Sequence, residues 1–498
     1  MADSLQDPLI HPKTINRVAD ISCELHGRGE RGCLTDAVRS FADESKKLWA
    51  IAGPAIFSRI TMYGTNVVTQ AFAGHLGELE LAAISIASTV IVGLNFGLFL
   101  GMGSALETLC GQAFGARQYE KLGLYMQRAW IVLFAVAILL LPMYIFATPI
   151  LKLLGQPDDI AELTGTVSIW FIPQHLSFVF LFPVQRFLQS QLKNMIIAWI
   201  SAATLVFHVF LSWLFITKLE MGLIGLAMTL NLAWWLPPIG QILYATCGGC
   251  PLTWKGLSRD AFSDLWPFVK LSVASGVMLC LENWYYRVLV LLTGNLPDPQ
   301  VAVDSLSICM SINGWEMMIP LGFFAATGVR VANELGAGNG KGAKYAVIVS
   351  AATSTMIGLV FYFLIIVFRQ EFAMAFTSSS AIIQAVSKLS ILLGFTVLFN
   401  SIQPVLSGVA VGSGWQNFVA YINIGCYYVI GVPFGVVLGW VFKQGVLGIW
   451  TGMICGTAVQ TLVLGIIVYR CDWDTEVAKA MDRVSAWSPE DVPCLTVG

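Results

Sequence analysis

The chain has 498 residues, of which 56% are hydrophobic and only 12% charged, and its net charge is −2. A soluble protein carries about 25% charged residues, so this composition excludes an ordinary soluble domain, and the near-neutral balance gives no sign of nucleic-acid binding. Positions 1–47 hold 15 of the 58 charged residues and positions 470–498 hold nine, which leaves 34 in the 422 residues between them. The sequence therefore predicts a polytopic membrane protein with a polar tail at each end.

The first 47 residues lack the basic start and short apolar core of a signal peptide. We expect residues 1–47 to form a disordered cytosolic tail, and the first transmembrane helix, beginning near Leu48, to direct insertion. Leu9-Ile10 has the form of a loose dileucine sorting signal, although such dipeptides are common in disordered tails.

Twelve apolar runs of about 20 or more residues follow, each long enough to cross a bilayer as a helix. An all-α membrane protein is expected, because a helix satisfies its own backbone hydrogen bonds in lipid. The predicted spans are residues 48–73, 81–105, 123–147, 163–185, 195–217, 221–246, 267–293, 301–328, 345–368, 382–411, 418–442 and 446–469.

Basic residues predict the orientation of these spans. Four lie in the connections after odd-numbered helices and ten in or beside those after even-numbered helices, which places the even-numbered connections and both termini in the cytosol. The ten are Arg117, Lys121, Arg128, Arg186, Lys193, Lys255, Arg259, Arg330, Lys341 and Lys344.

The longest polar connection, residues 247–266, follows the sixth span and divides the chain. It separates a first half, residues 48–246, from a second half, residues 267–469, which is followed by a cytosolic tail, residues 470–498. Six spans in each half return the chain to the same side, so two six-helix lobes in parallel orientation are predicted.

The two halves also repeat short motifs at a near-constant offset. Phe114-Gly115-Ala116 follows the second span and Leu335-Gly336-Ala337 follows the eighth, while Gly74-His75-Leu76 and Gly294-Asn295-Leu296 close the first and seventh spans. A parallel repeat of this kind places the substrate cleft of a transporter between its halves.

Three acidic residues interrupt the apolar runs of the second half. Glu282 and Glu316 lie near the middle of the seventh and eighth spans, and Asp304 lies only a few residues into the eighth, where an interfacial, hydrated position is expected. Burial at mid-bilayer disfavours the charged form of a carboxyl group, so such a residue can exchange protons between two compartments. We predict proton-coupling roles for Glu282, Glu316 and Asp304; the alternative is a structural ion pair with Arg59 or Arg287.

Arg59 lies near the middle of the first span, where an isolated charge is costly. It is expected either to pair with a carboxylate across the cleft or to bind backbone carbonyls within its own half. Both alternatives stay open on the sequence.

Further polar residues predict the wall of the cleft. On the tenth span, Asn400, Gln403 and Ser407 are spaced i, i+3 and i+7 and share one helix face. Asn283 and Tyr286 accompany Glu282 on the seventh span. Small polar groups that join neighbouring helices explain the tenth-span residues nearly as well.

Six stretches resemble those of plant multidrug and toxic compound extrusion (MATE) transporters, and the similarity runs from about Leu48 to Tyr469. They read AGPAIFSR, QAFAGHLGELELAA, ALETLCGQAFGARQYEKLG, LSICMSINGWEMMIPLGF, VRVANELGAGN and GVAVGSGWQ. The GWEMMI stretch resembles the transparent-testa-like, flavonoid-transporting members.

This resemblance implies twelve helices in two lobes, alternating access, and antiport of an organic solute against protons. It also implies that the acidic residues of the second lobe, Glu282 and its neighbours, carry coupling. Many prokaryotic members have an Asp on the first helix, whereas the matching stretch VVTQAFAG offers Thr69 or Gln70. Coupling through a first-helix aspartate therefore does not transfer to this chain.

No cofactor or metal is expected. Cys247-Gly-Gly-Cys250 has metal or redox spacing, but without a second pair or His ligands a turn is the better interpretation. Sodium coupling stays open beside proton coupling, although no dense cluster of oxygen ligands argues for it.

The sequence therefore predicts a monomeric, proton-coupled antiporter in the lipid bilayer. Its expected substrates are small organic solutes (flavonoids, other secondary metabolites or xenobiotics) moved from the cytosol into the vacuole or out of the cell, with the vacuolar membrane favoured. The alternative is a lipid or polyisoprenoid flippase with a similar cleft, and a channel is a third class. An enzyme is not indicated, because His175 and His208 have no ligand-spaced partners and no phosphate-binding loop is present.

Overall fold

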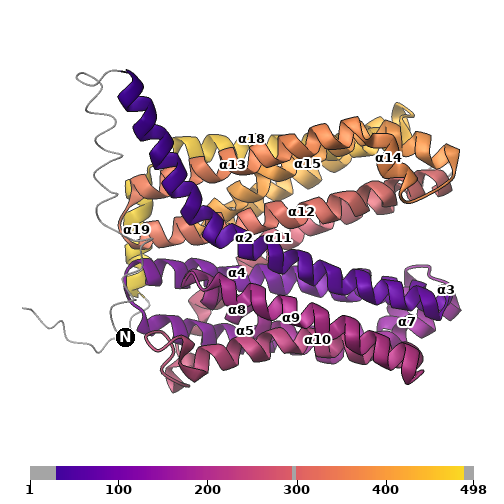
Figure 1. Ribbon diagram of the computed structural model, residues 1–498, viewed down its shortest axis with the longest axis horizontal. Coiled ribbons are helices and arrows are strands. Elements are labelled where there is room, and N and C mark those ends of the chain that lie inside the picture. Colours follow the sequence, from indigo (N-terminus) through magenta and orange to yellow (C-terminus); the bar gives the residue numbers. More distant parts are fainter. Residues whose placement is uncertain (1–29, 294–298, 487–498) are drawn as a thin grey trace, which may run out of the picture.

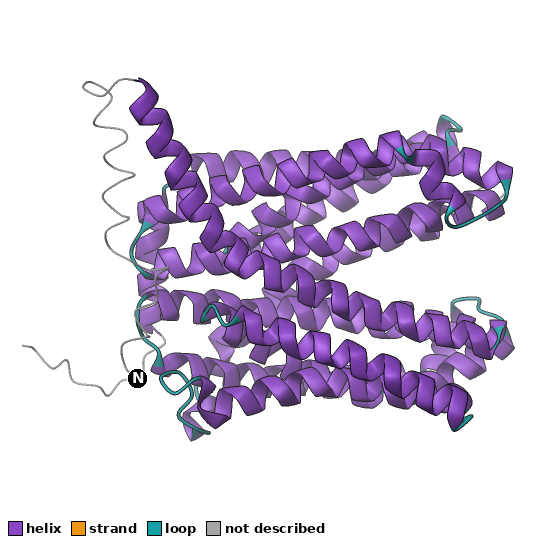
Figure 2. Cartoon of the chain, viewed as in Figure 1, coloured by secondary structure: helices purple, strands orange, loops and turns teal. Residues whose placement is uncertain are grey.

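The computed structural model describes residues 30–293 and 299–486, and in this part of the chain every regular element is a helix. Figure 2 shows these helices lying roughly parallel and joined by short loops. The expected all-α architecture is confirmed.

The first half of the chain supplies one bundle of long helices. Its elements are α2 (Glu30–Leu76), α3 (Glu78–Ile86), η3 (Ala87–Val92), α4 (Gly93–Gly115), α5 (Glu120–Ile145), α6 (Ala147–Leu153), α7 (Asp158–Trp170), α8 (Ile172–Ser190), α9 (Asn194–Trp213), η4 (Leu214–Lys218), α10 (Gly222–Tyr244) and η5 (Ala245–Gly249). A π-helical turn, η3, joins α3 to α4, so Glu78–Gly115 is one apolar span.

The second half supplies a matching bundle. Its elements are η6 (Arg259–Phe262), α11 (Leu265–Thr293), α12 (Pro299–Gly336), α13 (Gly340–Val367), α14 (Arg369–Met374), α15 (Ser380–Ser413), α16 (Gln416–Asn423), η7 (Ile424–Gly431), α17 (Val432–Val436), η8 (Val437–Val441), α18 (Gly445–Arg470) and α19 (Trp473–Ala486). The run from α16 to η8 is a single span, Gln416–Val441.

Eleven of the twelve predicted spans have the length and hydropathy of a membrane-crossing helix in the described residues, when the bent pair is counted as one span. Among the described residues, ten helices are long and apolar enough to cross a membrane, and α7 with α8 forms an eleventh that is bent by 47°. The remaining span is α2, which runs the whole length of the bundle (Figure 1).

The prediction of a disordered N-terminal tail was wrong for residues 30–47, and the predicted C-terminal tail contains a helix. Residues 30–47, expected to be disordered, extend α2 outward from the bundle, and residues 473–486 form α19. One face of α19 is apolar and buried, which gives a polar segment enough contact area to stay helical. The dileucine pair at positions 9–10 lies outside the described residues.

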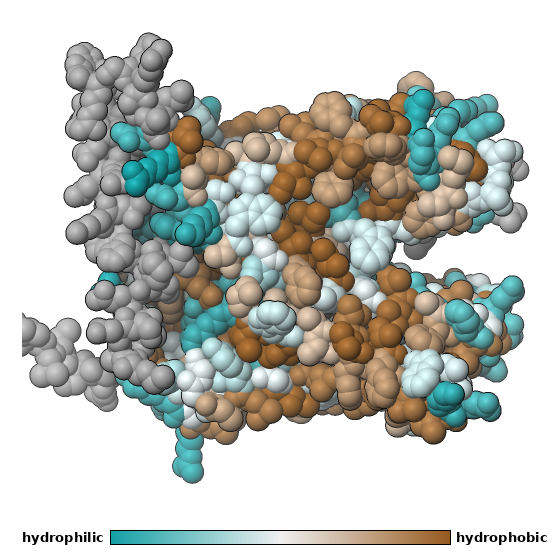
Figure 3. Space-filling view, viewed as in Figure 1, coloured by the Kyte–Doolittle hydropathy of each residue, from teal (hydrophilic) through white to brown (hydrophobic). Residues whose placement is uncertain are grey.

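The helices divide into a first lobe (α2–α10) and a second lobe (α11–α18), which form the lower and upper halves of Figure 1. At the end where α19 lies the lobes touch, and we call this the closed end. At the opposite end, beside α3 and α14, Figure 3 shows a notch between the lobes; we call this the open end. The cleft predicted between the halves is therefore accessible from one end.

The closed end is sealed where α4 of the first lobe packs on α12 of the second. A Cβ atom on Gly115 would overlap the backbone carbonyl of Asn333, and one on Gly336 would overlap the backbone carbonyl of Gln112. Glycine at both positions lets the two backbones touch. The repeated FGA and LGA motifs of the sequence thus face each other across the lobe interface.

Hydrogen bonds to backbone carbonyls reinforce this seal. The hydroxyl of Thr108 donates to the carbonyl of Val411 at 2.5 Å, and the side-chain amide of Gln112 donates to that of Gly412 at 2.9 Å. Both bonds join α4 of the first lobe to α15 of the second, so they exist only while this end is closed.

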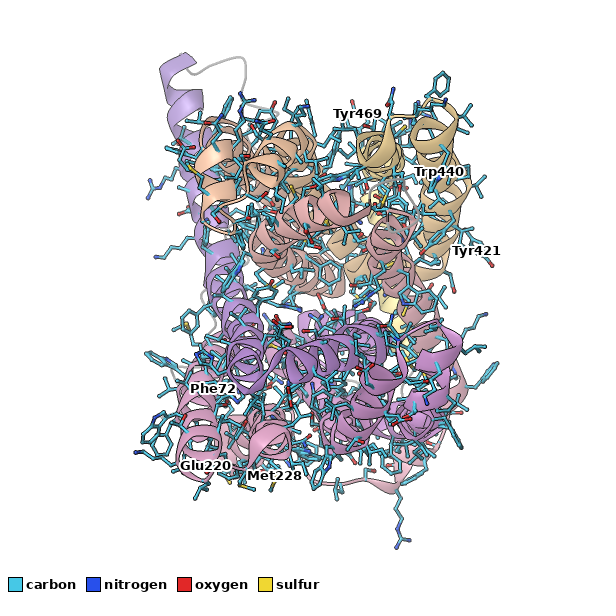
Figure 4. The ribbon with its side chains drawn as sticks, turned by 90° about the vertical axis from the view of Figure 1, so that its right-hand side faces the viewer. Phe72, Glu220, Met228, Tyr421, Trp440 and Tyr469 are labelled. Carbon is cyan, nitrogen blue, oxygen red and sulfur yellow. The ribbon has the colours of Figure 1, made fainter. Side chains whose placement is uncertain are left out.

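The outer surface of the bundle is largely apolar, as Figure 3 shows. Aromatic side chains lie on its margin: Tyr421 and Tyr469 are 75% and 84% exposed and point away from the second lobe in Figure 4, which looks onto the open end. Such exposure suits contact with lipid and its headgroups. The polar residues that the next section describes lie inside the bundle instead.

Candidate functional site

Glu282 lies on α11, 17 residues after the helix begins at the closed end, and faces α15 and α16 of its own lobe. Its Oε1 accepts hydrogen bonds from the hydroxyl of Ser407 at 3.0 Å and from the side-chain amide of Asn423 at 3.2 Å. Both donors are neutral. A neutral donor can stay hydrogen-bonded to either the ionised or the protonated carboxyl, so this arrangement tolerates a change of proton occupancy.

Further amides hold these two donors in place. The amide of Gln403 donates to the hydroxyl oxygen of Ser407 at 2.9 Å, which turns the Ser407 proton toward Glu282. The side-chain amide of Gln460 donates to the side-chain oxygen of Asn423 at 3.2 Å. The second N–H of the Asn423 amide donates to the backbone carbonyl of Met278. Glu282 is therefore the endpoint of two oriented hydrogen-bond chains.

A second polar chain begins one helical turn further along α11. The hydroxyl of Tyr286 donates to Asn400 at 2.7 Å, and the amide of Asn400 donates to Asn313 on α12 at 3.1 Å. Tyr286 also interacts electrostatically with both Glu282 and Glu316. This tyrosine links the polar residues of α11, α12 and α15, and we call the residues of both chains the second-lobe network.

A pocket that is partly open to its surroundings lies beside this network, and we call it a cavity below. Its wall combines aromatic and small polar side chains and contains no charged residue. The lining residues are Tyr286, Thr396, Phe399, Asn400, Trp450, Met453, Ile454 and Thr457. Flat apolar surfaces with a few fixed hydrogen-bonding groups suit an organic solute with an aromatic ring.

Glu316 lies on α12 and is 5% exposed. Neither of its carboxylate oxygens has a hydrogen-bond partner among the described residues. A buried carboxyl without a partner is costly, whatever its protonation state. Its side chain is consequently available to a proton, a solute or a rearranged neighbour.

The structure separates the other predicted residues from this network. Asp304 is exposed near the start of α12, about 18 Å along the helix from Glu316. Asn283 points the other way, against Gly97 of the first lobe. Arg287 donates to the backbone carbonyl of Thr89 at 2.5 Å.

The proposed ion pairs with the second-lobe carboxylates are not found. Within the described residues, neither Arg59 nor Arg287 forms a salt bridge with Glu282 or Glu316. Arg59 instead lies in the first lobe within electrostatic range of Glu107 and Arg186. The alternative of a structural ion pair therefore fails for these two carboxylates in this conformation.

Sequence reasoning missed a fourth intramembrane carboxylate, Glu107. It is fully buried on α4, and its Oε2 lies 2.7 Å from Nη1 of Arg186 on α8, which is itself only 2% exposed. Arg186, which was counted in or beside the connection after the fourth span, lies on α8 near its end. Glu107 also reaches Gly328 of the second lobe, where an added Cβ would overlap it. The pair therefore lies at the lobe interface near the closed end.

The first lobe contains its own cavity, of about 340 Å³, but no carboxylate lines it. Its polar wall consists of hydroxyl groups and one amide, contributed by Thr61, Thr65, Gln185, Ser201 and Thr204. Glu282, the second-lobe residue predicted to exchange protons, thus has no counterpart in the wall of this first-lobe cavity.

The described residues contain no group of three or more His, Cys, Asp or Glu that could hold a metal ion. Cys247 lies in η5 and Cys250 directly follows it, beside the backbone carbonyl of Gly249, which accepts a hydrogen bond from Lys193.

Comparisons with known proteins agree with this architecture. The family described as MatE matches residues 54–214 and 274–437. Protein DETOXIFICATION 27 of Arabidopsis thaliana is 64% identical over 446 residues, which cover 89% of this chain and 92% of the relative. Protein DETOXIFICATION 26 of the same plant is 59% identical over 469 residues, 94% and 96% of the two chains.

A solved structure resembles the whole bundle. The crystal structure of the eukaryotic MATE transporter AtDTX14 superimposes with a TM-score of 0.85 at 36% identity and covers 89% of this chain and 99% of its own. The outward-facing structure of a multidrug resistance MATE family transporter, at 16% identity and a TM-score of 0.75, shares the fold.

Proposed function

The chain belongs to the MatE family of multi-pass membrane transporters, and from this premise we propose that it is a proton-coupled antiporter that exports organic solutes from the cytosol. As a transporter of this family it is not an enzyme. We propose alternating access as the mechanism, with both termini and the closed end facing the cytosol and the open end facing the acidic compartment. The vacuolar lumen is the favoured destination.

One observation carries this proposal: Glu282 is held by neutral donors beside an aromatic cavity. Since Ser407 and Asn423 are uncharged, a proton can join or leave Glu282 without breaking an ion pair. Tyr286 belongs both to the cavity wall and to the electrostatic surroundings of Glu282. Proton binding and solute binding can therefore influence each other through one side chain.

The coupling follows from the charge change. A proton that enters from the open end neutralises Glu282, which weakens the hydrogen bonds of Ser407 and Asn423 to it. Ser407 and Asn423 are then free to turn, which changes the arrangement of polar groups beside the cavity at Tyr286. Solute release is driven only if the solute binds the deprotonated form more tightly, because a ligand with equal affinity for two states shifts nothing.

The candidate substrates are planar, partly polar molecules such as flavonoids and other aromatic secondary metabolites. Support comes from the cavity wall, in which Tyr286, Phe399 and Trp450 provide ring surfaces and Asn400 provides an amide. Xenobiotics of similar shape belong to the same class.

Proteoliposomes with an acidic interior test the proposal. The purified chain should accumulate a flavonoid or a fluorescent aromatic solute, and a protonophore should abolish that accumulation. Glu282→Gln should insert normally but lose at least about 90% of gradient-driven uptake, because an amide keeps the shape and cannot exchange the proton.

The controls separate the competing explanations. A sodium gradient imposed without a pH gradient should not drive uptake. Accumulation that persists after the pH gradient is collapsed, or normal uptake by Glu282→Gln, contradicts the proposal. Movement of labelled lipid in place of soluble solutes indicates a flippase instead.

A further inference from the structure

The helix α19 follows the last span of the second lobe and lies across the closed end (Figure 1). It lies in the predicted cytosolic tail, residues 470–498, and the proposed transport mechanism gives it no role. Its contacts with the two lobes differ in kind. That difference indicates what the helix does.

The second lobe holds α19 firmly. Trp473 and Ala480 belong to an apolar cluster with buried residues of α12, α13 and α15. The indole N–H of Trp415 donates to Glu476 at 2.9 Å, and Arg483 donates to the backbone carbonyl of Ser413 at 2.7 Å. A buried aromatic anchor and two charged hydrogen bonds fix α19 to this lobe.

The first lobe holds α19 at its far end. Lys121, in the first turn of α5, donates to the backbone carbonyl of Val484 at 2.6 Å. Val484 lies in the last turn of α19, where a helix presents carbonyl groups and partial negative charge. The α19 helix also packs against α4 of the first lobe, the helix whose Gly115 forms the seal.

From this asymmetry we infer that α19 is a strap across the closed end, anchored on the second lobe and fastened to the first lobe by Lys121. When the lobes part at this end, the Lys121 hydrogen bond and the packing of α19 on α4 are lost, while the anchored contacts with the second lobe remain. The strap therefore favours the state closed at this end. Lys121 is a positioning residue, because it acts on the lobes through α19 and touches no solute. The inference rests on the proposed alternation between two states.

Hydrogen–deuterium exchange of the full chain in lipid nanodiscs measures opening of the closed end. In Lys121→Gln, peptides covering residues 104–116 and 326–338 should exchange roughly threefold to tenfold faster, the size expected for losing one typical hydrogen bond. Exchange elsewhere in the two lobes should stay at the parental rate.

Lys255→Gln provides the matched control. Lys255 pairs with Glu120, the residue before Lys121, but that pair joins α5 to the connection between the lobes and does not involve α19. It removes the same charge from the same end of the molecule. Its exchange at the seal should equal that of the parent.

A chain that ends at Lys479 tests whether Lys121 acts through α19. This chain keeps Trp473 and Glu476 but lacks Val484. It should exchange at the seal as fast as Lys121→Gln, and combining both changes should add nothing.

Three results would overturn the strap: unchanged exchange in Lys121→Gln, additive effects in the combined variant, or faster exchange throughout both lobes. The measurement uses neither solute nor a proton gradient. A failure of gradient-driven uptake is consequently a separate result from a failure of the strap.

Discussion

Two carboxyl groups on neighbouring helices, the buried Glu107 and the half-buried Glu282, have different kinds of partner. Glu107 of the first lobe lies 2.7 Å from the guanidinium of Arg186, and both side chains are almost completely buried. Glu282 of the second lobe accepts hydrogen bonds from the neutral side chains of Ser407 and Asn423. An opposite charge requires its partner to stay ionised, whereas a neutral donor accepts either form.

Their positions along the helices match this difference. Glu107 lies eight residues before the end of α4 at Gly115, about 12 Å from the closed end, and presses against Gly328 across the lobe interface. Glu282 lies about 26 Å from the closed end of α11, in the half nearer the open end. A fixed charge pair therefore lies at the seal, and a carboxyl group with neutral partners lies in the half nearer the open end, from which we propose that protons enter.

The largest expected effect is the loss of the charge pair. Glu107→Gln leaves Arg186 buried without its counter-charge, which costs about 3–5 kcal/mol of folding stability. Thermal unfolding of the purified protein, followed by its tryptophan fluorescence, should show a large drop in the midpoint. The double variant Glu107→Gln/Arg186→Met should recover part of that drop, because the Arg186 charge is then absent while the neighbouring Arg59 still lacks Glu107.

The same substitution at Glu282 should behave differently. Glu282→Gln replaces one acceptor by another of the same shape, so we expect the stability to change by less than about 1 kcal/mol. Thermal unfolding again provides the measurement. Equal destabilisation by Glu107→Gln and Glu282→Gln would remove the distinction between a structural and a functional carboxyl group.

Substitution of Glu316 should change the stability in the opposite direction. Its carboxyl is 5% exposed and lacks a hydrogen-bond partner among the described residues, so Glu316→Leu should raise the stability by about 1–3 kcal/mol. A stabilising change that also lowers gradient-driven uptake identifies a group kept for function. If the leucine variant is less stable than the parent, Glu316 has a structural partner in the native protein.

The membrane spans were predictable because a helix that crosses lipid needs a long apolar run, and such runs are visible in the sequence. The helices within the two tails were not predictable, because residues 30–47 and 473–486 have the average composition of solvated segments. Their helices depend on contacts with distant parts of the fold, as Trp473 and Glu44 illustrate. Glu44 binds Arg330 of the second lobe at 2.7 Å, a partner 286 positions away.

The charge pair at the seal was missed for a related reason. The predicted second and fourth spans ended at residues 105 and 185, just before Glu107 and Arg186, whereas the helices continue to Gly115 and Ser190. Each charge alone resembles the end of a span, and only their pairing across two helices allows both to be buried.

Glu282 was predicted to have a role because it lies near the middle of an apolar run. Among the described residues, no basic side chain pairs with it. Of its surroundings, Gln403 and Ser407 were predicted from their helical spacing. Asn423 and Gln460 were not, because single amides scarcely interrupt an apolar run. The sequence therefore reveals the titratable group of the second-lobe network better than the neutral residues that hold it.

The smallest expected effect concerns the cavity wall beside Glu282. Tyr286→Phe removes the hydroxyl that donates to Asn400 but keeps the ring, so the apparent affinity for an aromatic solute should fall severalfold, in line with about 1 kcal/mol for one hydrogen bond. Tyr285→Phe is the matched control: it removes the neighbouring hydroxyl, which donates to the carbonyl of Met453 outside the polar network. The concentration dependence of initial uptake should change for Tyr286→Phe and stay constant for Tyr285→Phe. Equal shifts in both variants would mean that the two tyrosines serve only the packing of the lobe.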